Sequence, residues 1–288
     1  MIKRTISTLT LWAVLILAIY YTRGYGFAAL IYILSVLASY EACSLLKKCG
    51  SNPSFKAVAV SETALFALIA LAAAKVTVIS PACLALLIIL FVILAFSLWA
   101  LKDPFSEHIR LRVLPSFCVF MAVGVMLSLY AILAFSFEGC GKFAGVTLAC
   151  WAIASAKFSD IGGYLFGASI GKRKLAPRVS PKKTWEGAIG GVVLSILASY
   201  LILRFSAPLF EGALQNANLL LLTLVAAPII AVFALISDLL ESVLKRRANI
   251  KDSGSTIPGI GGALDLADSM LLTAPISYLF AAFLIFAF

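Results

Sequence analysis

The chain has 288 residues, of which 62% are hydrophobic and 12% charged, and its formal net charge is +10. A mean hydropathy of +1.07 excludes an ordinary soluble domain. Its apolar runs can cross a hydrocarbon core of about 30 Å, which takes roughly 20 helical residues, and they lack the alternation of a membrane β-barrel. We therefore expect an all-α, polytopic transmembrane helical bundle that forms one integral-membrane domain over residues 1–288.

Nine apolar segments are predicted to span the membrane. The first follows Met1–Arg4 and resembles a signal peptide, but no A-x-A-like site follows it, so we expect an uncleaved helix. The nine segments are 5–22, 26–46, 57–74, 78–101, 113–136, 143–170, 187–205, 218–241 and 266–288.

Basic residues are distributed unequally between the two sides that these spans define. The side of the N-terminus carries 18 of the 23 Lys and Arg residues. The positive-inside rule makes that side cytoplasmic, so the N-terminus lies inside and the C-terminus outside. The two most basic loops, 171–186 and 242–265, then share the cytoplasmic face. This topology, together with anionic substrates, explains the net charge, and we expect no nucleic-acid partner.

The other ionisable or metal-binding residue types give weaker signals. Glu62 lies within the third span and is expected to face the bundle interior or a wet cavity, with a lipid-path role left open. Glu41 is expected near the cytoplasmic interface. His108 is the only histidine, and we expect no catalytic role for it. The six cysteines form no CxxC pair, so we predict neither a disulfide framework nor a zinc site.

A polar segment begins inside the sixth span, at residue 157, and ends at residue 187. Lys157 and Asp160 are three apart on a helix and are expected to pair, and the glycines that follow permit close helix packing. Ser180 or Thr184 is expected to cap the seventh helix, with Glu186 in its first turn. The positive-inside rule explains the charge of the loop 171–186, but it does not explain the residue order SPKKTWEG. The candidate substrate-binding residues here are Asp160, Ser180, Lys182, Lys183 and Thr184.

The densest polar stretch is the segment 242–268, which lies between the last two long apolar runs. Polar groups beside a membrane span are costly and usually functional. Its basic cluster can neutralise a triphosphate or a phosphomonoester, although such runs also arise as topology signals or lipid-headgroup binders. The turn Pro258–Gly262 offers backbone N–H groups to phosphate, but it is not a P-loop. The candidates here are Ser242, Lys245, Arg246, Lys251, Asp252, Gly261 and Gly262.

Four acidic residues form two pairs with helical i, i+3 spacing. Asp238 and Glu241 end the eighth span, and Asp265 and Asp268 begin the ninth. Carboxylates that share a helix face supply the hard oxygen ligands that Mg²⁺ prefers. Acids are also favoured in the first turn of a helix, and Asp238 could instead pair with a nearby basic residue. We assign Mg²⁺ binding to Asp238, Asp265 and Asp268 and leave Glu241 open.

The segment 242–268 resembles the signature of the phosphatidate cytidylyltransferases, or CDP-diacylglycerol synthases. Asp160, Tyr164 and Gly167 and the SPKKTWEG run are also similar to that family, so the resemblance covers roughly the C-terminal half. The positions in register are Ser242, Leu244, Lys245, Arg246, Lys251, Asp252, Gly254, Ile257, Pro258, Gly261, Gly262, Asp265 and Asp268.

Four positions depart from the family pattern. Ile260 replaces the usual His, Leu266 replaces the usual Arg, Ala267 is smaller than usual, and Ser237 stands where Gly is common. The first two changes remove groups that could touch phosphate, and they leave the carboxylates and the Lys and Arg residues in place. The expected mechanism therefore needs no histidine at position 260.

The resemblance implies that CTP and phosphatidic acid react to give CDP-diacylglycerol and pyrophosphate. A phosphomonoester is largely ionised at pH 7, so a general base is dispensable. Residues 141–288 then form the catalytic half, whereas 1–140 have no assigned role. Mg²⁺ is the expected cofactor, with a second metal left open, and the expected catalytic residues are Asp238, Asp265, Lys245, Arg246 and Lys251.

The expected setting is a bacterial plasma membrane, with membrane lipids as partners and the active site facing the cytoplasm; a homo-oligomer is left open. Two enzymatic alternatives are a CTP-dependent lipid kinase and a cytidylyltransferase for another lipid phosphate. An anion transporter would place charges within its spans, and a structural binder of anionic lipid would tolerate Asp265→Asn.

Overall fold

The computed structural model describes residues 17, 19–74, 81–101, 107, 109–137, 140–214, 219–257 and 261–286. These residues are almost all helical, which confirms the predicted all-α class. Most of the first predicted span, 5–22, lies outside the described residues. So do His108 and the part of the glycine-rich turn from Pro258 to Ile260.

The chain divides into two compact units. The first unit comprises Met1–Phe135 and Arg247–Ala267, and the second comprises Ser136–Arg246 and Asp268–Phe288. Most of the polar segment 242–268 therefore belongs to the same unit as the N-terminal helices. The chain passes from one unit to the other three times, after Phe135, after Arg246 and after Ala267.

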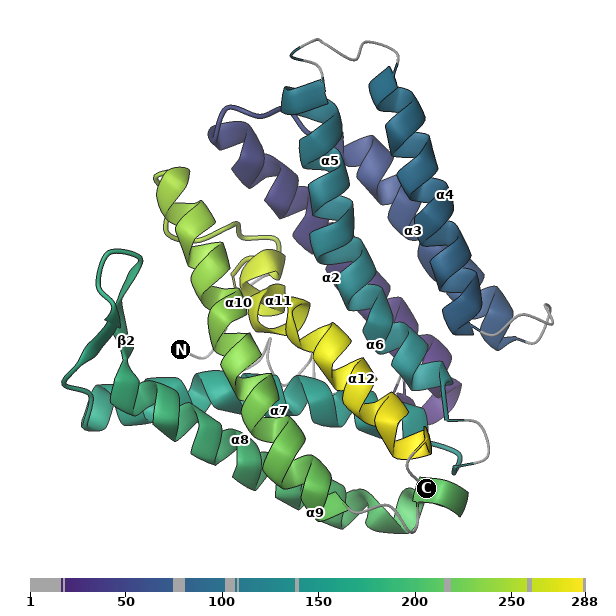
Figure 1. The fold of residues 1–288 in the computed structure, drawn as a ribbon, viewed down its shortest axis with the longest axis vertical. Helices are drawn as coiled ribbons and strands as arrows, with labels where there is room; N and C mark the ends of the chain where they lie inside the picture. The colour runs from purple at the N-terminus through teal and green to yellow at the C-terminus, as the bar shows by residue number, and fades with distance from the viewer. Residues whose placement is uncertain are drawn as a thin grey trace. The chain divides into compact units, whose positions relative to one another are not determined.

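The N-terminal part of the first unit is a set of adjacent helices. Helix α2 packs against α3 and α6, and α3 packs against α4 (Figure 1). Ser54 caps α3 by accepting a hydrogen bond from the Ala57 N–H at 3.4 Å. The elements are α2 (Gly24–Lys48), α3 (Phe55–Ala73), α4 (Pro81–Leu101), η1 (Ile109–Val113), α5 (Leu114–Val119), η2 (Phe120–Val125) and α6 (Met126–Phe135).

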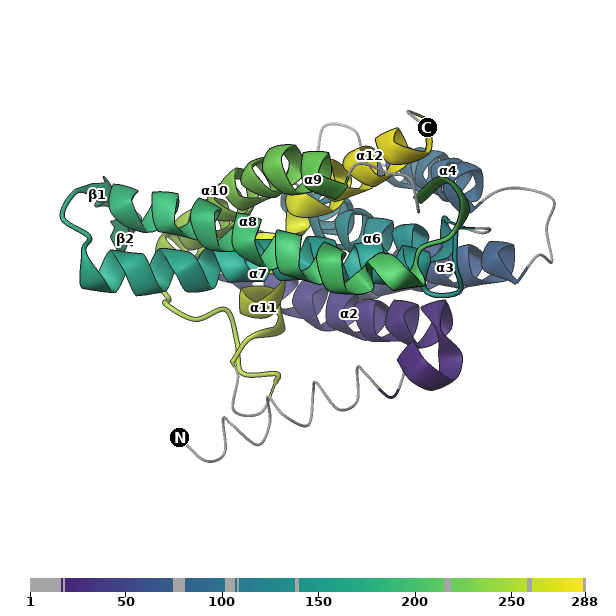
Figure 2. The ribbon, with the colours of Figure 1, turned by 90° about the horizontal axis from the view of Figure 1, so that it is seen from below.

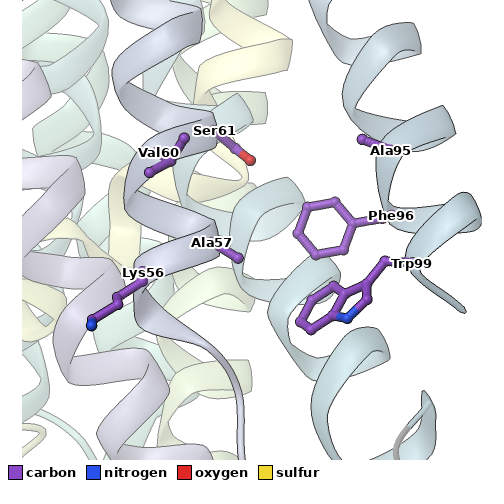
Figure 3. A pocket seen from close by; sticks show the side chains of 7 residues that line it. All are labelled: Lys56, Ala57, Val60, Ser61, Ala95, Phe96 and Trp99. Atoms are coloured by element: carbon purple, nitrogen blue, oxygen red, sulfur yellow. The ribbon is translucent and has the colours of Figure 1, made fainter. Parts of the chain in front are cut away.

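A pocket of about 390 Å³ lies between α3 and α4 in this unit. Figure 3 shows the rings of Phe96 and Trp99 facing Ala57, and the lining is mostly apolar. This lining suits apolar contacts rather than ionic chemistry. The residues around it are Lys56, Ala57, Val60, Ser61, Ala95, Phe96 and Trp99.

The second unit is built on two long helices, α7 and α8, which lie side by side in both views (Figures 1 and 2). Helix α12 also packs against α7. The elements are α7 (Ala144–Ser169), β1 (Lys174–Ala176), β2 (Ser180–Thr184), α8 (Trp185–Ser206), η3 (Ala207–Leu209), η4 (Gly212–Leu214), α9 (Leu219–Leu221), η5 (Leu222–Ala226), α10 (Ala227–Arg247) and α12 (Thr273–Phe286). The boundary between the two units falls within α11 (Ala263–Leu271).

Glycines bring α7 and α8 into backbone contact, as their number in the sequence predicted. A Cβ atom added to Gly162 would lie 2.7 Å from the Gly190 carbonyl oxygen, and one added to Gly187 would lie 2.7 Å from the Gly163 carbonyl oxygen. Real Cβ atoms do not approach other atoms this closely, so the helix contact requires glycine at both positions.

The basic loop between α7 and α8 is not wholly irregular. It forms an antiparallel β-hairpin in which Lys174 pairs with Thr184 and Ala176 pairs with Ser180. The Val179 N–H donates to the Ala176 carbonyl oxygen at 3.2 Å and closes the turn. Figure 2 shows this hairpin at the ends of α7 and α8.

Five helical segments among the described residues are long and apolar enough to cross a membrane. They are Gly24–Lys48, Phe55–Ala73, Ile109–Phe135, Trp185–Leu209 and Leu222–Arg247. Helices α11 and α12 bend by 43° and would form a sixth span if they cross together. Helix α7 has sufficient length, but Lys157 and Asp160 lower its hydropathy. The chain is therefore a polytopic integral membrane protein, and the number nine stays a prediction.

Candidate active site

The start of α8 fixes the base of the β-hairpin. Thr184 accepts a hydrogen bond from the Gly187 N–H at 3.1 Å, so it is the residue that caps this helix. The Glu186 carboxylate accepts hydrogen bonds from the N–H groups of Lys172 and Arg173, each at 3.1 Å. Two residues of the SPKKTWEG run thus have local structural roles, because Thr184 caps α8 and Glu186 binds the backbone at the start of the loop.

The C-terminal end of α10 carries polar side chains at helical spacing. Ser242 Oγ donates to Asp238 Oδ1 at 3.4 Å, and Lys245 Nζ donates to Glu241 Oε2 at 2.9 Å. Arg246 Nε donates to the Val179 carbonyl oxygen at 3.3 Å, so it connects α10 to the tip of the hairpin. Glu241 and Lys245 thus form an i, i+4 ion pair on α10.

Asp238 pairs with a residue far away in the sequence. Lys183 Nζ lies 2.6 Å from Asp238 Oδ2, and the two side chains are only 21% and 24% exposed. Lys183 comes from strand β2, so this ion pair joins the hairpin to α10. The sequence alternative, in which Asp238 pairs with a basic residue on its own helix, is not the pairing found.

Three carboxylates of the second unit converge. Asp238, Glu241 and Asp268 each offer one oxygen atom, and these oxygens lie within 4.8 Å of one another. Glu241 is buried, and the side chains of Asp238 and Asp268 are mostly shielded. Such a set of hard oxygen donors fits a divalent cation of the Mg²⁺ type.

Lysine side chains stand against this carboxylate cluster. Lys157 Nζ lies 3.6 Å from Asp268 Oδ1 and 3.9 Å from Asp160 Oδ2, and it donates to Ser269 Oγ at 2.7 Å. The predicted pair of Lys157 with Asp160 is thus present within a larger group. Ser237 Oγ donates to the Asp268 carbonyl oxygen and holds that backbone in place.

A pocket of about 210 Å³ opens beside the cluster. Asp160 and Asp238 contribute carboxylates to its wall, and Lys182 and Lys183 contribute amines, so it offers both signs of charge. The lining from α7, the hairpin, α8 and α10 is Ser159, Asp160, Gly163, Tyr164, Lys182, Lys183, Thr184, Gly187, Ala188, Gly191, Leu235 and Asp238. This juxtaposition suits an anionic ligand of modest size.

The remaining predicted site residues belong to the first unit. Asp265 accepts a hydrogen bond from the Ser253 N–H at 3.1 Å through Oδ2. Lys251 and Asp252 are exposed immediately before Ser253. Gly261 has φ +127° and pairs with Ile257 in an antiparallel bridge, so this position favours glycine. The buried Gly262 follows it and leads into α11.

One residue of this region was missed by the sequence reasoning. Glu41 of α2 is 2% exposed, and its carboxylate accepts hydrogen bonds from Ser253, Thr256 and Leu264. The sequence places it near the end of a predicted span but gives no signal of a partner more than 200 positions away. Glu62 is fully buried and accepts a hydrogen bond from Ser39 Oγ at 2.5 Å, as expected for a residue that faces the interior.

Comparison of the amino-acid sequence with known proteins shows which proteins this chain is similar to. Three similar proteins, each named phosphatidate cytidylyltransferase, come from Chlamydia trachomatis, Bacillus subtilis and Haemophilus influenzae. They are 35%, 41% and 38% identical over 62%, 48% and 41% of this chain, respectively. The aligned regions cover 60%, 48% and 39% of those proteins' own lengths.

A broader match covers nearly the whole sequence. The sequence model of the cytidylyltransferase family matches residues 2–284. The match therefore includes the N-terminal helices, for which the motifs alone gave no assignment. The chain belongs to the cytidylyltransferase family.

Proposed function

We propose that this protein transfers the cytidylyl group of CTP to phosphatidic acid, forming CDP-diacylglycerol and releasing pyrophosphate. The observation that carries the proposal is the group of carboxylates and lysines beside the pocket of the second unit. Family membership and the names of the three relatives support the same reaction.

The reaction is a displacement at the α-phosphorus of CTP. An oxygen of the lipid phosphate forms the new P–O bond, the bond from the α-phosphorus to the bridging oxygen breaks, and pyrophosphate leaves with that oxygen. Such a transfer depends on positioning and charge neutralisation rather than on a covalent protein intermediate. Lys182 and Lys183 of the hairpin and Lys245 of α10 would hold phosphate oxygens.

The carboxylate cluster would hold Mg²⁺. Asp238, Glu241 and Asp268 supply three converging oxygens. Asp265 is a further candidate because it precedes Asp268 by one turn on α11. When bound, Mg²⁺ would neutralise phosphate charge and polarise the reacting phosphorus. The lysines that now pair with the carboxylates would then be available to the substrate phosphates, and a second metal remains open.

The orientation follows from the distribution of basic residues. We place the N-terminus and the loops 171–186 and 242–265 in the cytoplasm, the C-terminus outside, and nine spans in a bacterial plasma membrane. Soluble CTP would reach the site from the cytoplasm, and phosphatidic acid would reach it from the membrane.

A labelling experiment tests the reaction and separates it from the nearest alternative. Purified protein in lipid nanodiscs containing phosphatidic acid is incubated with Mg²⁺ and CTP labelled at either the α- or the γ-phosphorus. We expect only the α-label to enter the lipid, with release of pyrophosphate. Transfer of the γ-label would instead identify a lipid kinase, and transfer of neither label would overturn the proposal.

A matched pair of variants relates the activity to the cluster. Asp238→Asn should abolish label transfer. Glu107→Gln removes a surface carboxylate that is 79% exposed and pairs with Arg110, so it should leave transfer unchanged.

A further inference from the structure

Glu41 makes an unusual set of contacts for a residue on a membrane-spanning helix. Its Oε1 accepts hydrogen bonds from Thr256 Oγ1 at 2.6 Å and from the Thr256 N–H at 3.4 Å. Its Oε2 accepts hydrogen bonds from Ser253 Oγ at 3.0 Å and from the Leu264 N–H at 2.9 Å. We call Glu41 with Ser253, Thr256 and Leu264 the Glu41 latch, and all four residues lie in the first unit.

Two glycines leave room for this carboxylate. A Cβ atom added to Gly254 would collide with the Glu41 carboxylate. One added to Gly262 would lie 2.7 Å from Glu41 Oε2 and 2.6 Å from Asp265 Oδ2. The Glu41 carboxylate therefore requires glycine at position 254, whereas at position 262 Ser253 Oγ and Asp265 Oδ2 are closer to the added Cβ than Glu41 is.

The Glu41 latch also supplies acceptors to the start of α11. The first N–H groups of a helix have no partner within the helix. Here the Ala263 N–H donates to Thr256 Oγ1 at 3.2 Å, and the Leu264 N–H donates to Glu41. A carboxylate is favoured at this end of a helix by the helix dipole. The Glu41 side chain thus acts as an N-terminal cap of α11, although it comes from another helix.

The same contacts reach a predicted catalytic carboxylate. Ser253 donates its hydroxyl to Glu41 and its backbone N–H to Asp265, so one residue connects the two acids. Lys251 and Asp252 immediately precede Ser253 and are exposed. Fixing Ser253 therefore fixes the backbone that carries both of these polar side chains.

We propose that Glu41 is a positioning residue, whose carboxylate holds the backbone around Ser253, Thr256 and Leu264 in the conformation in which Lys251 can bind a substrate phosphate and Asp265 can bind Mg²⁺. This inference rests on the proposed cytidylyl transfer for its functional consequence, but the Glu41 latch itself does not. Misplacement of reacting groups by about 1 Å can cost roughly 100-fold in rate. We therefore expect Glu41→Gln to lower kcat by about 10- to 100-fold, with a smaller change in the KM for CTP.

Hydrogen–deuterium exchange tests the Glu41 latch without any substrate. In wild-type protein in nanodiscs, the Thr256 and Leu264 amides should be protected. In Glu41→Gln, which loses the negative charge, these amides should exchange at least tenfold faster, while those of α8 are unchanged. Glu62→Gln is the matched control, because Glu62 is an equally buried glutamate of the same unit that bonds Ser39 instead. Unchanged exchange at Thr256 and Leu264 in Glu41→Gln would overturn the inference.

A double-mutant cycle that combines Gly254→Ala with Glu41→Ala gives a second test. Gly254→Ala should lower kcat strongly when Glu41 is present, because the new methyl group displaces the carboxylate. In a Glu41→Ala background the space is open, so Gly254→Ala should cost less than threefold further. Equal losses in both backgrounds would contradict the proposed contact, since independent sites give additive effects.

The two proposals can fail separately. If wild-type protein transfers no cytidylyl group, the proposed function fails, and the exchange experiment still decides whether the Glu41 latch exists. If wild-type protein is active and Glu41→Gln retains full kcat, the positioning role is wrong and the proposed function stands.

Discussion

Replacing Lys183 with methionine removes the ammonium group that lies 2.6 Å from Asp238 Oδ2. At that distance, and with an effective dielectric constant of about 20, the attraction between the two charges is about 6 kcal/mol before desolvation is subtracted. Desolvation offsets much of this attraction for partly buried pairs. Because both side chains retain about a fifth of their exposure, we expect a net coupling of about 1–3 kcal/mol.

A double-mutant cycle measures that coupling. The free energy of unfolding is compared for wild type, Lys183→Met, Asp238→Asn and the double variant in the same detergent. We expect Lys183→Met alone to destabilise, since it leaves a shielded carboxylate without its partner, and Asp238→Asn to relieve part of that loss. Lys174→Met, an exposed lysine on the other strand of the hairpin, should change stability by less than about 0.5 kcal/mol. Additivity within about 0.5 kcal/mol would refute the reasoning.

Three further predictions concern the cap of α8, the packing of α7 on α8, and the metal. Thr184→Ala removes the cap of α8 and should lower the free energy of unfolding by about 1 kcal/mol, whereas Thr184→Ser should restore it. Gly162→Ala should cost about 1–3 kcal/mol, because its Cβ would lie 2.7 Å from the Gly190 carbonyl oxygen. Gly163→Ala, whose Cβ would meet its nearest atom at 3.8 Å, should be nearly neutral, and equal effects of the two alanines would contradict this packing. Chelation with EDTA should abolish cytidylyl transfer and Mg²⁺ should restore it; transfer that survives chelation would contradict the metal assignment.

Contacts between residues close in sequence were predictable. The spacing of Lys157 and Asp160 predicted their ion pair, because side chains three positions apart meet on one helix face. Thr184 was one of two candidate caps, and the structure selects it. Hydropathy also located the described helices, because the length of each apolar run is a local property of the sequence.

Contacts between residues distant in sequence could not be predicted. Glu41 bonds Leu264 across 223 positions, and Lys183 of strand β2 pairs with Asp238 of α10. No periodicity connects such pairs, because their contact depends on how the helices pack. The resemblance to a known signature located Gly254 and Gly262, but only their neighbours in the structure explain why they are small: Glu41 beside Gly254, and Ser253, Asp265 and Glu41 beside Gly262.

The sequence also did not show that Asp265 and Asp268 contact different partners. Asp265 and Asp268 have the same spacing as any i, i+3 pair, yet their partners differ. Asp265 bonds the Ser253 N–H of the first unit, whereas Asp268 lies beside Lys157 of the second. The structure also brings Glu241, which the sequence left open, into the carboxylate group. We therefore expect Glu241→Gln to lower the Mg²⁺-dependent transfer of the α-label of CTP into the lipid.

Single-turnover transfer of α-labelled CTP into phosphatidic acid tests the central claim most directly. Wild-type protein and Asp238→Asn are compared in the same nanodiscs, after each is shown to be folded by its unfolding transition. We predict that wild-type protein forms labelled CDP-diacylglycerol and that Asp238→Asn forms less than about 1% as much. Equal transfer by the two proteins would contradict the assignment of the carboxylate cluster as the site of the reaction.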